Sequence, residues 1–397
     1  MATYQPGTAR ERVGPPAKLV CLLDKADPPH HSFVDGMLAT ALPRSRRVRV
    51  ILVVSGSGGS RRPYRYRQAI CVPSLWQRRG FGRFLNYFLA RAILERVLAK
   101  RGRISVLVRN DPVLLTAAAS LRRNFSRLLF QSSHPHEDLA KGVVKRQIAR
   151  YLFRGASPQV DALLAVSPPG IERMRTYFTR AESEGYIPLL AEPIARMDTA
   201  PSPTPISAPL KIIYIGSHSA IREVELSIAA FGEAVRMGAN AQLTMVGAAP
   251  SDLERLRAAP GVRELEEASL LHFVSRVTRP MIPPLLAQAD VGSCLIAPHP
   301  GFREMSPTKL AEYMACGLAV IGTKGIPMQE KFITDSGGGI LTDWSISSIS
   351  SAIYVLAADR NKVEEMKKAS LDYARTKLQY SHYVDEIVKL SGISDAV

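Results

Sequence analysis

The 397-residue sequence has only four cysteines and no long apolar run. Cys21, Cys71, Cys294 and Cys316 are scattered without the spacing of metal ligands, which is typical of buried thiols in a reducing compartment. This usage excludes a disulfide-stapled miniprotein. No segment approaches the roughly 18 consecutive apolar residues that a membrane-spanning helix needs, and no pattern of a secretory signal opens the sequence. These absences favour a cytoplasmic protein, either soluble or attached to a membrane surface.

The sequence also lacks internal repeats and heptads, which excludes solenoids and long coiled coils. Hydrophobic residues make up 46% and charged residues 22% of the chain, so most of it is expected to fold. At about 150 residues per domain, the length predicts two or three domains. The net charge of +17 is unevenly distributed, since residues 1–200 carry +19 and the remainder −2. The two halves are therefore expected to face different partners.

A segment rich in Pro, Ser and Thr, residues 198–209, separates these halves and predicts a linker. On both sides of it, short apolar runs such as KLVCLLD and LKIIYIG alternate with amphipathic helical patterns. This alternation predicts βαβ units around parallel sheets. We expect an α/β fold with two Rossmann-like, doubly wound domains, residues 1–197 and 210–378, whose ligands bind at the carboxyl ends of the strands.

The most informative segment is GFREMSPTKLAEYMACGLAVIGT. Ser306 is expected to cap a helix, Pro307 suits its first position, and Gly317 suits the left-handed position past its end. Glu304 lies in the loop before this helix and Glu312 within it. Carboxylates placed there would bind sugar hydroxyls, and the helix N-terminus would suit a diphosphate. The alternative is that Glu304 is a solvated acid and Glu312 a surface residue.

The run from Glu304 to Glu312 resembles the E-x7-E motif of retaining family-four glycosyltransferases of the GT-B superfamily. The stretch SPTKLAEYMACGLAVIGT is similar to the SPxKLxEYMAxGxPVI pattern of their bacterial members. The resemblance extends over about residues 210–378, because IYIG, LTMVG, LHFVSRV and LLAQADVGSCLIAP follow in the family's order. It implies a GT-B architecture, in which two Rossmann-like domains face a cleft and the last segment, residues 379–397, forms a helix that crosses back.

The resemblance also implies roles for individual residues of this segment. Glu304 would hold hydroxyls of the donor sugar, with a catalytic role, and Glu312 the ribose hydroxyls of the nucleotide. The loop and helix start between them would approach the sugar and the diphosphate, with Phe302, Arg303, Met305 and Ser306 as its members.

In the family, a Gly-Arg-x4-Lys-like loop follows the first strand of the donor domain, and its two cations neutralise the diphosphate. Here Arg222 follows Gly216 by six residues and takes the place of the lysine, whereas Ser217 stands where the arginine is usual. The alternative for Arg222 is an exposed arginine at a helix start. One cation is missing unless another replaces it. Three candidates lie nearby in the implied site: Lys309, Arg303 and Arg276.

The segment HFVSRV would line the base pocket through Ser275 and Arg276, with the turn 322–325 on the same rim. No DxD-type or His-rich metal pair accompanies these features. Cations and a helix N-terminus can stabilise a leaving diphosphate without a metal. We therefore expect no metal and no cofactor, with a nucleotide diphosphate sugar as the donor substrate.

The N-terminal half would supply the acceptor side. FQSSHPHED places His134 and His136 at the end of a predicted strand, where family members carry a histidine near the reaction centre. Loop packing is the alternative for His134. His30 and His31 replace the glycines that usually follow the first strand, so a close approach of the backbone to the acceptor is less assured.

Basic and aromatic residues alternate in a helix predicted over residues 81–98. Phe81, Leu85, Phe88 and Leu89 can share one face, and four arginines lie at its margins: Arg78, Arg79, Arg83 and Arg91. Such a helix can lie in an anionic membrane interface, where each basic group contributes ~1 kcal/mol. The alternative is a core helix with snorkelling arginines. No nucleic acid partner is expected, because no reader motif accompanies the charge.

These features predict a glycosyltransferase, cytoplasmic and peripheral on the inner face of the plasma membrane. It would move a hexosyl unit from a UDP- or GDP-sugar to a hydroxyl of a glycan or lipid-linked glycan, in cell-surface polysaccharide biosynthesis. Retention of configuration is implied by the resemblance. Two alternatives stay open: a GT-B nucleotide-sugar epimerase or hydrolase, and a degenerate nucleotide-binding subunit without transfer activity, which Ser217 would explain.

Overall fold

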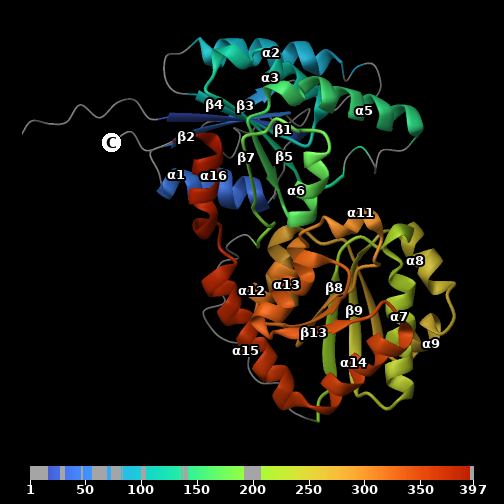
Figure 1. Cartoon of the computed structure of the whole chain (residues 1–397). Helices are drawn as coiled ribbons and strands as arrows, with labels where there is room; N and C mark the ends of the chain where they lie inside the picture. The colour runs from blue at the N-terminus through green and yellow to red at the C-terminus, as the bar shows by residue number, and fades with distance from the viewer. Residues whose placement is uncertain are drawn as a thin grey trace, which may run out of the picture.

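The computed structural model describes residues 17–26, 32–45, 48–55, 69–72, 82, 84–99, 104–135, 137, 142–191 and 207–393. Within them the chain forms two parallel β-sheets flanked by helices, one sheet in each half of the molecule (Figure 1). The expected α/β fold with two Rossmann-like sheets is confirmed. Of the predicted linker, residues 198–206 lie outside the described residues.

The N-terminal sheet has seven strands in the order β3-β2-β1-β4-β5-β6-β7. They are β1 (Ala17–Ala26), β2 (Val48–Ser55), β3 (Ala69–Val72), β4 (Ile104–Arg109), β5 (Arg127–Ser132), β6 (Ala162–Ala165) and β7 (Ser183–Tyr186). Near-continuous apolar runs form the central strands because helices cover both faces of the sheet. These helices are the π-helix η1 (Phe33–Ala41), α1 (Leu42–Ser45), α2 (Leu85–Leu98), α3 (Pro112–Ala119), α5 (Val143–Ala156) and α6 (Pro168–Arg175).

The C-terminal sheet has six strands in the order β10-β9-β8-β11-β12-β13. They are β8 (Leu210–Ile215), β9 (Ala241–Ala248), β10 (Leu271–Ser275), β11 (Val291–Cys294), β12 (Ala319–Thr323) and β13 (Gly339–Thr342). Its helices include α7 (Val224–Arg236), α8 (Pro250–Arg257), α9 (Val262–Glu267), α10 (Ile282–Leu286), α11 (Pro300–Arg303), α12 (Thr308–Ala315), α13 (Pro327–Ser336), α14 (Ile346–Ala358) and α15 (Arg360–Lys377). The strand order reverses between β8 and β11, which makes the ends of these strands the natural ligand site.

The C-terminal segment returns to the N-terminal half after α15. A short helix η8 (Tyr380–Tyr383) leads into α16 (Val384–Ser391), which packs against β4 to β7 (Figure 1). The hydroxyl of Ser105 on β4 donates a hydrogen bond of 2.7 Å to the carbonyl oxygen of Ser391. The end of the chain is thus fastened to the first sheet.

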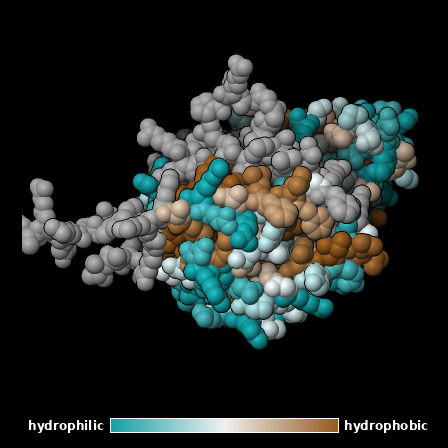
Figure 2. Space-filling model, turned by 90° about the horizontal axis from the view of Figure 1, so that it is seen from above, coloured by the Kyte–Doolittle hydropathy of each residue, from teal (hydrophilic) through white to brown (hydrophobic). Residues whose placement is uncertain are grey.

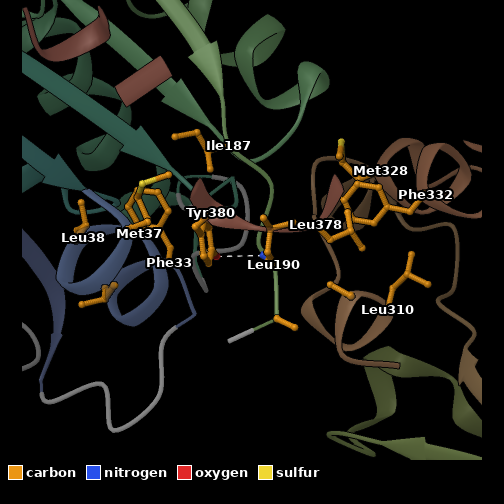
Figure 3. Close-up of a cluster of buried hydrophobic side chains, with 14 of the residues drawn as sticks. Phe33, Met37, Leu38, Ile187, Leu190, Leu310, Met328, Phe332, Leu378 and Tyr380 are labelled. Atoms are coloured by element: carbon orange, nitrogen blue, oxygen red, sulfur yellow. Dashed lines mark hydrogen bonds between the residues drawn. The ribbon is translucent and has the colours of Figure 1, made fainter. Parts of the chain in front are cut away.

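One hydrophobic cluster runs through both halves and centres on Tyr380 (Figure 3). The Tyr380 ring packs edge-on against Phe33, with the ring centroids 6.2 Å apart. Its hydroxyl accepts a 3.0 Å hydrogen bond from the Leu190 N–H and donates one of 3.2 Å to Ser32. Figure 3 also labels the other members of the cluster drawn there: Met37, Leu38, Ile187, Leu310, Met328, Phe332 and Leu378.

Gly36 tests this packing, because a Cβ at Gly36 would collide with the Tyr380 ring, which its neighbours hold in place. Gly36→Ala is expected to lower the free energy of unfolding by about 1–3 kcal/mol, the usual cost of overpacking a core. Thermal and urea unfolding measure this change.

Gly155→Ala on α5 is the matched control, because no atom lies within 4 Å of a Cβ built there. It is expected to leave stability unchanged or to raise it by about 0.5–1 kcal/mol. Equal unfolding midpoints for Gly36→Ala and Gly155→Ala would show that the Tyr380 ring is not tightly packed against Gly36.

Candidate functional site

The helix of the E-x7-E motif, α12, starts one residue later than the sequence predicts. Pro307 is its N-cap residue, and the expected capping by Ser306 is wrong. The Ser306 hydroxyl instead accepts a 2.9 Å hydrogen bond from the Leu189 N–H of the N-terminal half. Gly317 has a φ of 70°, which confirms the left-handed position just past the helix end.

Glu312 is buried within α12, so the alternative of a surface residue is excluded. Its carboxylate pairs with Arg279, whose Nη2 lies 2.8 Å from Oε1. Arg279 lies after β10, three residues beyond the predicted site residue Arg276, and no motif in the sequence marks it. The pair compensates a carboxylate that burial would otherwise make costly.

Two cations lie near the carboxyl ends of β8 and β11. The Lys309 ammonium is 4.1 Å from the centroid of the Tyr214 ring, and it lies so close to Gly216 that a Cβ there would collide with it. The Arg222 guanidinium is 4.5 Å from the centroid of the Phe302 ring. Lys309 therefore brings a second cation to the loop in which Ser217 stands.

The charges of both cations affect the pKa of the buried Cys294 at the end of β11. Burial raises the pKa of its thiol to about 11, while the charges of Lys309 and Arg222 act in the opposite direction. The two cations thus share one neighbourhood at the point where the strand order reverses. The other replacement candidates, Arg276 and Arg303, are exposed, as is Ser275 at the end of β10.

Glu304 follows α11 and meets the N-terminal half. Arg173 on α6 donates from Nε to both Glu304 carboxylate oxygens, at 2.9 and 2.7 Å. The Ser167 hydroxyl, which also caps α6, donates a 2.7 Å hydrogen bond to the Glu304 carbonyl oxygen. Glu304 is therefore not a solvated acid. Neither Arg173 nor Ser167 was predicted, because PPGIERMR reads as an ordinary surface helix.

His134 lies at the end of β5, half-buried, with Nδ1 3.0 Å from the Ser133 hydroxyl. The neighbouring Ser132 hydroxyl donates to the His134 carbonyl oxygen and accepts from Arg173 Nη2 at 2.7 Å. The structure thus connects the His134 loop to Glu304 through Ser132 and Arg173. The other three predicted acceptor-side residues lie outside the described residues: His30, His31 and His136.

Of the remaining donor-side predictions, Phe302 is buried under Arg222, and Met305 is partly buried against the cluster around Tyr380. In the turn 322–325, the Thr323 hydroxyl accepts a 3.0 Å hydrogen bond from the Ile296 N–H. Among the described residues, no three His, Cys, Asp or Glu side chains are grouped so that they could hold a metal ion.

Comparisons with known proteins fit this arrangement. Residues 209–359 match the profile of the family described as glycosyl transferases group 1. The fold resembles sucrose-phosphate synthase from Thermosynechococcus elongatus, with a TM-score of 0.68 and 16% identity, covering 94% of this chain and 98% of that chain.

Two further structures cover 94% of this chain. One is an α,α-trehalose-phosphate synthase (UDP-forming) from Burkholderia xenovorans in complex with glucose-6-phosphate, with a TM-score of 0.65, 12% identity and 99% of that chain covered. The other is HepE from Anabaena in complex with UDP and glucose, with a TM-score of 0.63, 15% identity and 98% of that chain covered. The search of curated protein sequences gives no match.

The fold and the matched segment define the class of protein. The chain has the GT-B fold, as expected, and it is an enzyme of the glycosyltransferase class. The segment that matches the glycosyl transferases group 1 profile, residues 209–359, contains both Glu304 and Glu312.

His218 in the loop after β8 is fully buried. Its Nδ1–H donates a 2.9 Å hydrogen bond to the Gly216 carbonyl oxygen, and its ring packs edge-on against Tyr214. Burial lowers the pKa of His218 to about 4, and the nearby charges of Lys309 and Arg255 act in the same direction. The imidazole is therefore neutral at physiological pH.

This shift predicts a loss of stability in acid. Between pH 6.5 and pH 4 the unfolded chain binds a proton at His218 that the folded chain does not, so the free energy of unfolding falls as the pH falls. The loss reaches at most about 3.5 kcal/mol, at about 1.4 kcal/mol per pKa unit. Unfolding midpoints measured across this range check it.

His218→Asn is expected to flatten this pH dependence, because its amide can replace the Nδ1–H donor but does not titrate. His272→Asn, on an exposed position of β10, is the control and is expected to keep the wild-type profile. Parallel pH profiles for wild type and His218→Asn would contradict the assignment.

Proposed function

We propose that the protein moves a hexosyl unit from a UDP- or GDP-sugar to a hydroxyl of a glycan or lipid-linked glycan, with retention of configuration, in cell-surface polysaccharide biosynthesis. One observation carries the proposal: Lys309 and Arg222 lie together at the ends of β8 and β11, inside the segment that matches the glycosyl transferases group 1 profile. Glu312, on the same helix as Lys309, is buried and paired with Arg279. The similar structure of HepE, in complex with UDP and glucose, supports a nucleotide sugar as donor.

In this proposal, Lys309 and Arg222 bind the diphosphate together with the backbone N–H groups at the start of α12. Glu312, oriented by Arg279, accepts the ribose hydroxyls, and Ser275 and Arg276 border the base. Glu304 accepts hydroxyls of the donor sugar. Cations aimed at the leaving diphosphate stabilise the charge that develops as the glycosidic bond breaks. We propose that this arrangement works without a metal or cofactor.

The acceptor is proposed to approach from the N-terminal half, where His134 faces the same junction through Ser132 and Arg173. The enzyme then acts mainly by positioning the acceptor hydroxyl against the anomeric carbon and by stabilising the departing diphosphate. His30, His31 and His136 are proposed to border the acceptor.

A thermal-shift panel of UDP, GDP, ADP and their common sugars, with and without EDTA, tests the donor site. One nucleotide is expected to raise the unfolding midpoint of the wild type. At a nucleotide concentration about one hundred times Kd, binding stabilises the folded protein by about 2.7 kcal/mol. The shift is expected to be insensitive to EDTA and to be lost in Glu312→Ala. Glu304→Gln is expected to keep most of the nucleotide shift but to abolish transfer, because it alters the contact with the sugar.

Glu233→Ala is the matched control, since Glu233 lies on α7 in an exposed pair with Arg236. It is expected to bind nucleotide like the wild type. No shift with any nucleotide would favour the degenerate subunit, and near-normal turnover of Glu304→Gln would refute its donor role. Release of free sugar without an acceptor would favour a hydrolase.

We further propose that the enzyme is cytoplasmic and binds the inner face of the plasma membrane through its N-terminal half. Within the described residues, no helix is long and apolar enough to cross a bilayer. Large apolar side chains are nevertheless exposed around α2 and α5: Phe84, Leu85, Phe88, Val143, Val144, Ile148 and Tyr151. Viewed from above, this end of the molecule shows hydrophobic areas bordered by hydrophilic ones (Figure 2).

Helix α5 supports the proposal most directly. Its residues Val144, Ile148 and Tyr151 follow one stripe at helical spacing, opposite the buried Ala149 and Phe153. Val144 is 71% and Tyr151 77% exposed, which a core helix would not allow. Two exposed basic side chains flank the stripe, Lys145 on one side and Arg154 on the other, whereas Arg146 and Arg150 lie further towards the buried face. An apolar stripe between cations suits an anionic lipid surface. On α2, Phe88 is 65% exposed, on the side away from the buried Ala90 and Leu94, which supports the same surface.

Replacing Lys145 and Arg154 by Ser is expected to weaken sedimentation with phosphatidylglycerol vesicles roughly 30-fold, at ~1 kcal/mol per cation. Tyr151→Ser is expected to weaken it independently of salt, because it removes apolar area. Arg78, Arg79 and Arg83 lie outside the described residues, and their triple serine variant is expected to release the protein from the vesicles as well.

Tyr354→Ser is the control, because Tyr354 is an exposed aromatic residue on α14 of the other half. Its sedimentation is expected to match the wild type. Unchanged sedimentation of the α5 variants would refute the membrane surface, and tight retention on duplex DNA by the wild type would point to a nucleic acid partner instead.

A further inference from the structure

Three polar contacts from the N-terminal half meet on the loop that carries Glu304. Ser167 donates to the Glu304 carbonyl oxygen at 2.7 Å, and Leu189 donates to the Ser306 hydroxyl at 2.9 Å. Arg173 adds the ion pair with the Glu304 carboxylate at 2.7 Å. The N-terminal partners all follow the ends of β6 or β7. One short loop of the donor domain is therefore docked by the opposite half.

Arg173 also binds two side chains of its own half, Glu137 and Ser132. Its Nη1 pairs with Glu137, a side chain only 1% exposed, and its Nη2 donates to Ser132 on β5 at 2.7 Å. Only the Nε contact crosses to the other half. Arg173 is thus presented to Glu304 by contacts that do not depend on the donor domain.

One guanidinium here serves two carboxylates. Burial lowers the pKa of Arg173, but the charges of Glu137 and Glu304 outweigh this effect and raise it, so the group stays cationic. The trio of Arg173, Glu137 and Glu304 carries a net charge of −1. A negatively charged cluster favours further hydrogen bonds to the Glu304 and Glu137 carboxylate oxygens. Sugar hydroxyls can donate such hydrogen bonds.

We propose that Arg173 is a positioning residue that fixes the Glu304 carboxylate when the two halves close, so that closure itself assembles the sugar-binding side of the site. The sugar-binding part of this inference rests on the proposed function. The hydrophobic cluster around Tyr380 forms the pivot, because it joins the halves through apolar contacts beside the charged loop. Hydrogen bonds between the halves at this loop can be replaced by hydrogen bonds to water when the halves separate. Separating the apolar cluster would instead expose hydrophobic side chains to water, which is unfavourable.

Arginine is required because its fork reaches three partners at once. A lysine at this position keeps the charge but cannot span Glu304, Glu137 and Ser132 together. Arg173→Lys is therefore expected to restore only part of the wild-type behaviour, whereas a role of bulk charge alone predicts full rescue.

The test compares wild type, Arg173→Gln and Arg173→Lys in two measurements. Small-angle scattering without ligand is expected to show a larger radius of gyration for Arg173→Gln. Calorimetry with UDP and UDP-glucose, or with GDP and GDP-mannose if that pair binds, is expected to show an unchanged nucleotide Kd. The advantage of the nucleotide sugar over the nucleotide is expected to fall roughly tenfold.

Arg175→Gln is the matched control. Arg175 lies two residues further along α6 and pairs with Glu184 at an exposed position. It is expected to match the wild type in both measurements. An unchanged radius of gyration for Arg173→Gln overturns the proposal, and so does an unchanged affinity ratio in a protein that binds the nucleotide sugar. If the wild type binds no nucleotide, the proposed function fails, and the scattering alone decides whether Arg173 holds the halves together.

Discussion

The packing of Tyr380 sets the relation between the two halves on which the site depends. Its ring fills the space above Gly36, and its hydroxyl satisfies the Leu190 N–H. Tyr380 follows α15, the last helix of the C-terminal half before the chain returns to the N-terminal half. It therefore connects the end of the C-terminal half to helix η1 of the N-terminal half. Leu190 follows β7, directly after the segment that contacts Ser306. The apolar pivot and the polar docking of the Glu304 loop are thus neighbours in the structure.

The loop 302–306 joins two kinds of recognition. At one end, Phe302 packs under the Arg222 guanidinium, near Lys309 and the end of β8. At the other, Glu304 meets Arg173 from the opposite half. Cationic groups suited to a diphosphate and carboxylates suited to hydroxyls are therefore held a few residues apart. This separation matches a nucleotide sugar, whose charge lies on the diphosphate and whose hydroxyls lie beyond it.

The sequence predicts strands and helix ends, because these depend on local residue patterns. It does not predict hydrogen bonds and ion pairs between residues that are far apart in the chain. Apolar runs and turn glycines such as Gly317 correctly predict the two sheets and the end of α12. Ser306 fails as a cap because its hydroxyl is engaged by Leu189, 117 residues away. Arg173 lies 131 residues from Glu304, and nothing in its helix distinguishes it from the exposed Arg175. Such pairings arise only when both sheets are in place.

The exposed apolar stripe on α5 begins at Val144, ten residues after His134 in the sequence. His134 and Glu137 lie on the junction side, and α5 begins at Val143. The nine residues from His134 to Val143 span at most about 30 Å when fully extended, so the start of α5 lies within that distance of His134. If α5 rests on lipid as proposed, an acceptor anchored in the same bilayer has only this short distance to cover. The geometry therefore favours acceptors whose hydroxyl lies close to the membrane surface over those at the far end of a long glycan.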